Sequence, residues 1–135
     1  MEEKMKKVAV LMVFSALVLA LTVIGAKAKA VDLLEYEIAF FNNGTCTGDD
    51  YIKVGRGEFP DFRSLQNAWK DGAPKENWND KISCVQLGTM GKVTVYQDIN
   101  FKGKSKTITY TTKNGGKVSF AGDWWNDRAS SAKVQ

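Results

Sequence analysis

The same cluster of oxygen-bearing residues occurs twice in the sequence. Trp-Asn-Asp, two further residues and Ser stand at 78–83 and again at 125–130. The two sets of oxygen donors are Asn79, Asp80 and Ser83, and Asn126, Asp127 and Ser130. Calcium takes about six to eight oxygen ligands and accepts neutral ones, whereas magnesium requires a stricter octahedron. Each cluster therefore indicates part of a calcium site, which a second backbone segment or water must complete.

A simpler interpretation is that Asn, Asp and Ser only bond to the backbone of their own loop. The duplication favours the metal site, because each cluster also follows a second repeated pattern. This pattern is an aromatic residue, four residues, a residue of a buried type, one residue and Gly. It comprises Phe41, Cys46 and Gly48 in the first copy, and Tyr96, Phe101 and Gly103 in the second. Internal repeats of this kind are typical of duplicated supersecondary units.

Short strands must position these clusters. Alternating or β-branched runs predict strands at 34–41, 50–54, 92–96, 105–112 and 117–121, with turn signals at 42–44, 88–91 and 114–116. One helix is predicted over 61–70, with Asp61 as its cap and Phe62, Leu65 and Trp69 on one face. We expect Trp78 and Trp125 to anchor the core, whereas Trp124 cannot easily face inward beside Trp125. Many short strands between regular turns predict an all-β sandwich or barrel.

The first thirty residues are predicted to be a targeting segment. Three Lys lie within 1–7, an apolar run covers 8–26, and Ala28-Lys29-Ala30 is a small-residue cleavage site. This order is typical of a secretory signal peptide, and we expect cleavage after Ala30, with a second possible site at 26–28. The apolar run is also long enough to span a bilayer, so an uncleaved anchor is the alternative.

The charge and the cysteines limit the classes of function. Of the 19 basic and 15 acidic residues, five Lys and two Glu lie in the leader, which leaves 14 and 13 and a net charge near +1. This balance predicts no strong attraction to nucleic acid or to membranes after cleavage. The absence of His excludes His-based catalytic triads and His-ligated zinc. Cys46 and Cys84 both follow the leader, which favours a disulfide over two buried thiols.

With these motifs the sequence resembles a βγ-crystallin domain of the microbial, calcium-binding kind. That family pairs two Greek-key motifs, each with an aromatic-x4-aromatic-x-Gly hairpin and an Asn/Asp-Asn/Asp-x-x-Ser/Thr-Ser segment. The second copy, about 91–135, matches throughout and ends in Ser130 and Ser131. The first copy, about 36–88, has Cys46 in place of the second aromatic residue and Cys84 in place of the final Ser. The resemblance implies a sandwich of two Greek-key motifs, with one short helix, over 31–135.

The resemblance also implies a site for each motif. Two calcium ions would each join a cluster to a hairpin backbone carbonyl, by position those of Asn42 and Gln97. The final Ser of the motif supports the hairpin, so a Cys46–Cys84 bridge would replace that support in the first copy. Which hairpin serves which cluster is left open, and the departures weaken the first site.

The resemblance therefore implies a secreted, non-catalytic calcium-binding module, with a periplasmic or cell-surface location also possible. No protein partner is indicated. The main alternative is a secreted effector on the same scaffold, a protease inhibitor or antimicrobial toxin, using an exposed turn at 71–74 within the long segment 55–75. A hydrolase would need paired carboxylates, and scattered acids are usually solvated surface. The scattered acids are Asp49, Asp50, Glu58, Asp61 and Asp71.

Overall fold

The computed structural model describes residues 31–68 and 72–135. This part of the chain contains ten strands and three 3-10 turns. The strands are β1 (Ile38–Phe41), β2 (Tyr51–Val54), β3 (Gly57–Phe59), β4 (Leu65–Gln66), β5 (Lys75–Glu76), β6 (Cys84–Leu87), β7 (Lys92–Asp98), β8 (Lys102–Thr109), β9 (Lys117–Ser119) and β10 (Ser131–Val134). The 3-10 turns are η1 (Phe62–Ser64), η2 (Ile99–Phe101) and η3 (Thr112–Asn114).

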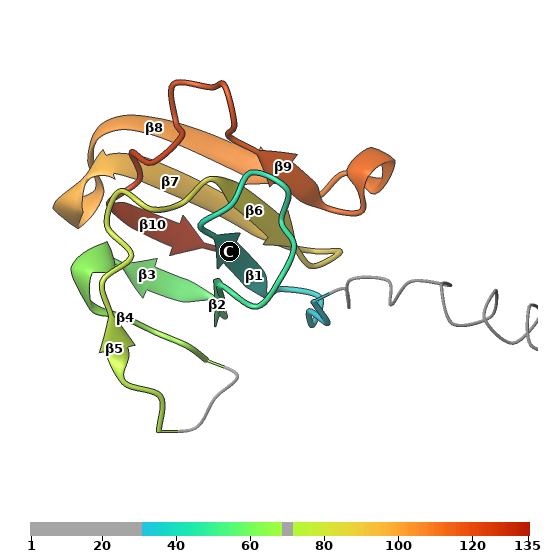
Figure 1. Ribbon diagram of the computed structural model, residues 1–135, viewed down its shortest axis with the longest axis horizontal. Helices are drawn as coiled ribbons and strands as arrows, with labels where there is room; N and C mark the ends of the chain where they lie inside the picture. Colours follow the sequence, from blue (N-terminus) through green and yellow to red (C-terminus); the bar gives the residue numbers. More distant parts are fainter. Residues whose placement is uncertain (1–30, 69–71) are drawn as a thin grey trace, which may run out of the picture.

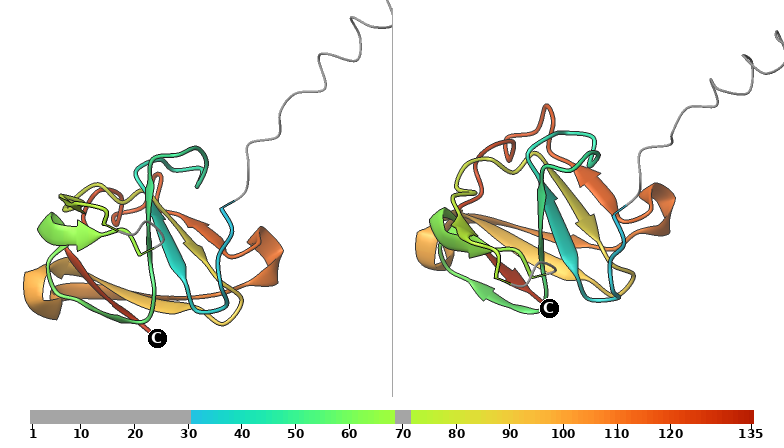
Figure 2. Two further views of the ribbon diagram at one scale, coloured as in Figure 1. Left: turned by 90° about the horizontal axis from the view of Figure 1, so that it is seen from below. Right: turned by 60° about the horizontal axis from the view of Figure 1, so that its bottom comes forward.

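The strands form two four-stranded antiparallel sheets that pack as two layers (Figures 1 and 2). One sheet has the order β2-β1-β6-β9 and the other the order β3-β10-β7-β8. Each half of the chain therefore gives one strand to the other half's sheet: β3 pairs with β10, and β9 pairs with β6. The prediction of an all-β sandwich is confirmed, and the exchanged strands tie the two repeats together.

Alternating side chains build the core between the sheets. In β7, Val93 and Val95 are fully buried while Thr94 between them is partly exposed. In β1, Ile38 and Phe40 join the central core, whereas Ala39 and Phe41 belong to a smaller cluster with the two cysteines on the other face of the sheet. Val31, Leu33 and Tyr51 cover that cluster, which explains why β1 is buried on both faces.

The five predicted strand segments all contain strands, but the predicted helix over 61–70 is wrong. Asp61 does cap a turn, accepting a hydrogen bond from the backbone of Arg63, but that turn is the short η1 and does not continue as an α-helix. A continuing α-helix would need the Phe62 carbonyl to accept from the residue four positions later. That carbonyl instead accepts from the backbone N–H of Trp78 at 2.6 Å, and the chain continues into β4, which pairs with β5. Long-range pairing has therefore overridden a short helical pattern.

Two further predictions lie outside the described residues. They are the leader at 1–30 with its cleavage site, and residues 69–71, which include Trp69 of the predicted helix face and Asp71 of the predicted exposed turn. Across 31–68 and 72–135, no helix is long and apolar enough to cross a membrane.

Gln86 is a buried polar side chain that is only half satisfied. It lies in β6 with 9% of its surface exposed, and its Nε2 donates to the Val31 carbonyl at 3.3 Å. Its Oε1 is the one fully buried side-chain oxygen or nitrogen in the described residues without a hydrogen-bond partner. An unmade buried hydrogen bond costs more than a made one contributes.

We predict that Gln86→Leu raises the free energy of unfolding by about 1 kcal/mol, because it removes the unpaired oxygen. Urea unfolding measures the change. Gln66→Leu is the control, since the Gln66 Nε2 makes a 3.0 Å hydrogen bond to the Ala73 carbonyl and that side chain is exposed. A loss of stability in Gln86→Leu equal to or greater than that in the control would contradict the prediction.

Candidate metal centre

The two Asn-Asp-x-x-Ser loops have nearly the same backbone. Asp80 and Asp127, at the second position of each cluster, both adopt left-handed φ angles, 56° and 54°. Asp and Asn tolerate this region better than other side chains, which gives the motif a conformational reason as well as a chemical one. Trp78 and Trp125 anchor the loops and are 4% and 7% exposed, as predicted. Trp124 is 37% exposed, also as predicted.

The loops lie against each other and exchange backbone hydrogen bonds. The Asp80 N–H donates to the Ala129 carbonyl at 3.2 Å, and the Asp127 N–H donates to the Ile82 carbonyl at 3.1 Å. This reciprocal pair brings the aspartates of the two repeats into one region. The sequence resemblance implied one site for each motif and left the pairing of hairpins and clusters open, and in the structure the two clusters lie together.

Each loop is also tied to the hairpin of its own repeat. The Ser83 N–H donates to the Phe41 carbonyl at 2.8 Å, and the Ser130 N–H donates to the Tyr96 carbonyl at 2.9 Å. The hairpin residue that follows each aromatic, Asn42 or Gln97, is therefore held next to its own loop. This answers part of the question that the sequence left open.

The acidic side chains are held by amides and by one long-range hydroxyl. Asn79 Nδ2 donates to Asp80 Oδ2 at 2.8 Å, and Asn126 Nδ2 donates to Asp127 Oδ2 at 3.0 Å. Ser83 Oγ donates to Asp127 Oδ1 at 2.9 Å, from the other repeat. The matching bond from Ser130 to Asp80 is not formed within the described part of the chain. The two halves of the centre are therefore not equivalent.

An open depression of about 510 Å³ lies beside Asp80 and Ser130, the pair that lacks this hydrogen bond. It brings together Gln97, Asn126, Asp127 and Ser130 of the second repeat with Asp80 of the first. Asp98 and Arg128 complete its lining, and sequence reasoning missed both. Asp98 directly follows Gln97, whose backbone carbonyl was predicted as a ligand, so its position in the sequence could have indicated it. Arg128 occupies a variable position of the motif, which gave no such indication.

The residues predicted for the first site are not brought together in the same way. Asn42 lines a separate depression of about 320 Å³, together with Asp50 and Lys81. Its side-chain amide donates to the Asp50 carboxylate. Asp80 instead faces the other depression, and Ser83 is bonded to Asp127. Asn79 holds the Asp80 carboxylate and lines neither depression.

The donor atoms suit a hard cation. Among residues 31–68 and 72–135, no three His, Cys, Asp or Glu side chains are close enough to form a metal-binding group by themselves. The open depression is lined by three carboxylates, two side-chain amides and one hydroxyl, with Arg128 as its only basic lining residue. Calcium accepts such mixed and neutral oxygen donors, whereas transition metals prefer imidazole or thiolate.

The hairpins are locked by different chemistry in the two repeats. In the second, Ser131 Oγ donates to the Asp98 carbonyl at 2.6 Å and accepts from the Phe101 N–H at 3.1 Å. In the first, the predicted disulfide is present, joining Cys46 to Cys84 with their Cα atoms 5.3 Å apart. Cys84 occupies the position of Ser131 and Cys46 that of Phe101, so a covalent bond stands where the other repeat has a hydrogen bond.

The predicted hairpin glycines have a backbone reason. Gly48 and Gly103 adopt φ angles of 82° and 75°. At Gly103 a Cβ would also stand 2.5 Å from Asp98 Oδ2, so any side chain would displace the wall of the open depression. The ring of Phe101 packs edge-on against Tyr96, with centroids 5.6 Å apart, and completes the hairpin.

Two of the scattered carboxylates, those of Glu58 and Asp61, are engaged with basic side chains. Glu58 is ion-paired with Lys133 at 3.2 Å. Asp61 is bonded to Arg63 at 2.6 Å, and the side-chain hydrogen bond from Arg63 lowers the pKa of Asp61. A lowered pKa suits a permanently ionised group and not a general acid. Near the metal centre, the hydrogen bond from Lys106 lowers the pKa of Asp123 in the same way.

Comparison with known proteins identifies the fold. No protein-family model and no curated protein sequence matches the chain. Solved structures do match. One comes from work on the evolution of the eye-lens βγ-crystallin domain fold, with 23% identity, a TM-score of 0.57 and coverage of 82% of this chain and 93% of that one. The N-terminal domain of Protein S has 20% identity, a TM-score of 0.51 and coverage of 73% and 94%.

A βγ-crystallin domain from Clostridium beijerinckii is also similar, with 21% identity, a TM-score of 0.50 and coverage of 72% and 94%. The chain therefore has the βγ-crystallin domain fold, which confirms the fold that the sequence resemblance implied. At these identities the likeness concerns the fold, and the chemistry rests on the residues described above.

We predict that Ser131→Ala lowers the free energy of unfolding by about 1–3 kcal/mol, because it leaves a buried carbonyl and N–H without their shared partner. Chemical unfolding of the oxidised protein measures this. Ser105→Ala, at an exposed position of β8, is the matched control and should stay within about 0.5 kcal/mol of the parent. Equal effects of the two substitutions would show that Ser131 does not lock the hairpin.

Proposed function

We propose that this chain is a secreted calcium-binding module without catalytic activity. The observation that carries the proposal is the open depression in which Asp80 of one repeat meets Gln97, Asn126, Asp127 and Ser130 of the other. Within it, the carboxylates of Asp80 and Asp127, the Ser130 hydroxyl and the Gln97 backbone carbonyl would hold the ion, with Asn126 beside them. Water or a ligand would complete the coordination shell.

A second site would involve Asp127, Ser83 and the Asn42 carbonyl, with Asn79 and Asp80 shaping the loop. It requires the 2.9 Å hydrogen bond from Ser83 to Asp127 to give way to metal ligation. Breaking this hydrogen bond costs free energy, and ion binding in the open depression does not involve that cost. We therefore expect two unequal sites, the stronger in the depression.

Calcium would act here as a cross-link between the repeats. An ion that binds only the folded state stabilises it by about 2.7 kcal/mol at a hundredfold excess over its dissociation constant. The disulfide stabilises the fold independently, by about 4 kcal/mol in the loop-entropy model. Disulfides persist in oxidising compartments, which supports export together with the predicted leader.

The effector alternative rests on the long segment between β2 and β6. Its β4–β5 arm projects from the sandwich (Figure 1) and borders a depression of about 620 Å³. Gly72 is exposed, but Ala73 is 6% exposed and its carbonyl accepts from Gln66, so only part of the predicted turn is presented. An inhibition assay against secreted proteases tests this alternative.

We predict that the processed, oxidised protein binds calcium in preference to magnesium. Isothermal titration should reach millimolar metal, because extracellular calcium modules can have dissociation constants of about 0.1–1 mM. Asp80→Asn should weaken the depression site, and Asp127→Asn should weaken both sites, because Asp127 faces both halves. Asp32→Asn, at an exposed position outside the centre, is the control. Wild-type stoichiometry and affinity in both Asp80→Asn and Asp127→Asn would remove these carboxylates from the ligand set.

We predict that calcium raises the melting temperature whether the disulfide is oxidised or reduced. The ligand oxygens do not depend on the Cys46–Cys84 bond, so reduction should lower both melting curves and leave the calcium-dependent gap. Thermal unfolding with calcium or chelator, in each redox state, measures the gap. No gap in either state would mean that the centre does not bind the ion in the folded protein, and the effector alternative would then be preferred.

A further inference from the structure

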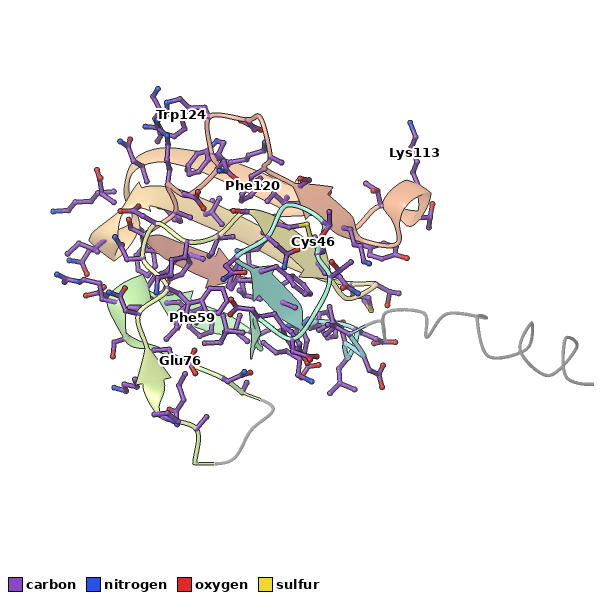
Figure 3. All side chains as sticks on the ribbon, viewed as in Figure 1. Cys46, Phe59, Glu76, Lys113, Phe120 and Trp124 are labelled. Carbon is purple, nitrogen blue, oxygen red and sulfur yellow. A yellow bond between two sulfur atoms is a disulfide. The ribbon has the colours of Figure 1, made fainter. Side chains whose placement is uncertain are left out.

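Trp124 is an exposed aromatic side chain beside the proposed metal centre. With 37% of its surface exposed, it is one of three exposed large hydrophobic residues in the described part of the chain, the others being Leu34 and Met90. Its ring packs edge-on against the buried Trp125, with centroids 5.2 Å apart. Figure 3 shows Trp124 at the outer edge of the molecule, on the side of β8. The indole is therefore held by the core and still reaches solvent.

Two cations lie over the Trp124 ring. Lys104 Nζ is 4.3 Å from the ring centroid and Arg128 Cζ is 4.9 Å from it. Neither has a carboxylate partner within salt-bridge distance in the described residues, whereas the neighbouring Lys106 is paired with Asp123 at 2.7 Å. The two cations are held in place by the ring and keep their charge available to an anion.

This group is continuous with the metal centre. Arg128 lines the open depression, and the Lys104 N–H donates to Gln97 Oε1 at 3.4 Å. Lys104 lies in β8, which is an edge strand. We call Lys104, Arg128 and Trp124 the cationic rim.

The charge of this face depends on the metal. Without an ion, the three carboxylates of the depression, those of Asp80, Asp98 and Asp127, outnumber the two cations of the rim by one. Calcium adds two positive charges at the same place, so the loaded face is cationic. The protein also supplies fewer oxygens than calcium takes, which leaves coordination positions for an oxygen of a bound anion.

We propose that the calcium-loaded face docks on bilayers that contain anionic phospholipid. A headgroup phosphate would share its oxygens between the ion and the rim cations, as phosphate does with Arg and Lys elsewhere. Trp124 would lie at headgroup depth, where amphipathic indoles are enriched in membrane proteins. The proposal rests on the proposed calcium site. It revises the expectation that a net charge near +1 gives no strong attraction to membranes, because here the attraction comes from the local arrangement of the ion and the rim cations.

Sedimentation with vesicles tests the proposal on the processed, oxidised protein. Vesicles of phosphatidylcholine with phosphatidylglycerol are compared with vesicles of phosphatidylcholine alone, each with calcium or with chelator. We expect binding only with anionic lipid and calcium together, falling as salt is raised. Equal binding with chelator, or equal binding to neutral vesicles, would overturn the proposal. So would the absence of binding under all four conditions.

Variants separate the rim from the calcium site. Lys104→Gln should reduce vesicle binding about fivefold, the effect of one Lys near an anionic surface, and Trp124→Ala should reduce it further. Both should keep the parent's calcium affinity by titration, because neither side chain is a proposed ligand. Lys113→Gln is the control, since Figure 3 shows Lys113 at the other end of the molecule. Equal losses in Lys104→Gln and Lys113→Gln would contradict a specific rim.

Two results distinguish this proposal from the one on which it rests. Calcium binding without vesicle binding would overturn membrane docking and leave the calcium site intact. No calcium binding at all would overturn the calcium site and, with it, the docking. Millimolar glycerol phosphate should compete only weakly, because it offers a single headgroup without a surface; complete displacement would identify a soluble phosphate ligand and contradict bilayer docking.

Discussion

The reciprocal hydrogen bonds between the two Asn-Asp-x-x-Ser loops are the constraint on which the rest of this molecule depends. They run from Asp80 to Ala129 and from Asp127 to Ile82, over 3.2 and 3.1 Å, and join segments far apart in the sequence. The exchange of β3 and β9 between the sheets places the loops side by side. The hydrogen bonds hold the two oxygen clusters side by side, so that Asp80 of the first repeat lines a depression with Asp127 and Ser130 of the second.

The two repeats solve the same local problem with different chemistry. A hairpin with left-handed residues must be held against the last strand of its repeat. Ser131 does this with two hydrogen bonds to the second hairpin, and the Cys46–Cys84 disulfide does it in the first. The covalent lock does not use the side chains of the proposed ligands. This separation explains how the first motif can depart from its pattern while the shared centre keeps Asp80.

Local sequence patterns predicted what local physics determines. The strand segments, the capping role of Asp61, the buried Trp78 and the exposed Trp124 all follow from residue type and spacing. The helix prediction failed because the Phe62 carbonyl is used by the Trp78 N–H, a contact that no local pattern reveals. Which hairpin serves which oxygen cluster was left open by the sequence for the same reason. Asp80 lines a depression with residues of the second repeat, and Ser83 donates to Asp127, which are contacts between segments far apart in the sequence.

The central claim is that one calcium site is shared between the repeats, and a double-mutant cycle on calcium affinity tests it most directly. If Asp80 and Ser130 hold the same ion, Asp80→Asn and Ser130→Ala should be non-additive, with an interaction energy of at least about 0.5 kcal/mol. Independent sites within each repeat would instead make Asp80 and Ser130 additive and place the coupling between Asp80 and Ser83. That second result would contradict the shared centre.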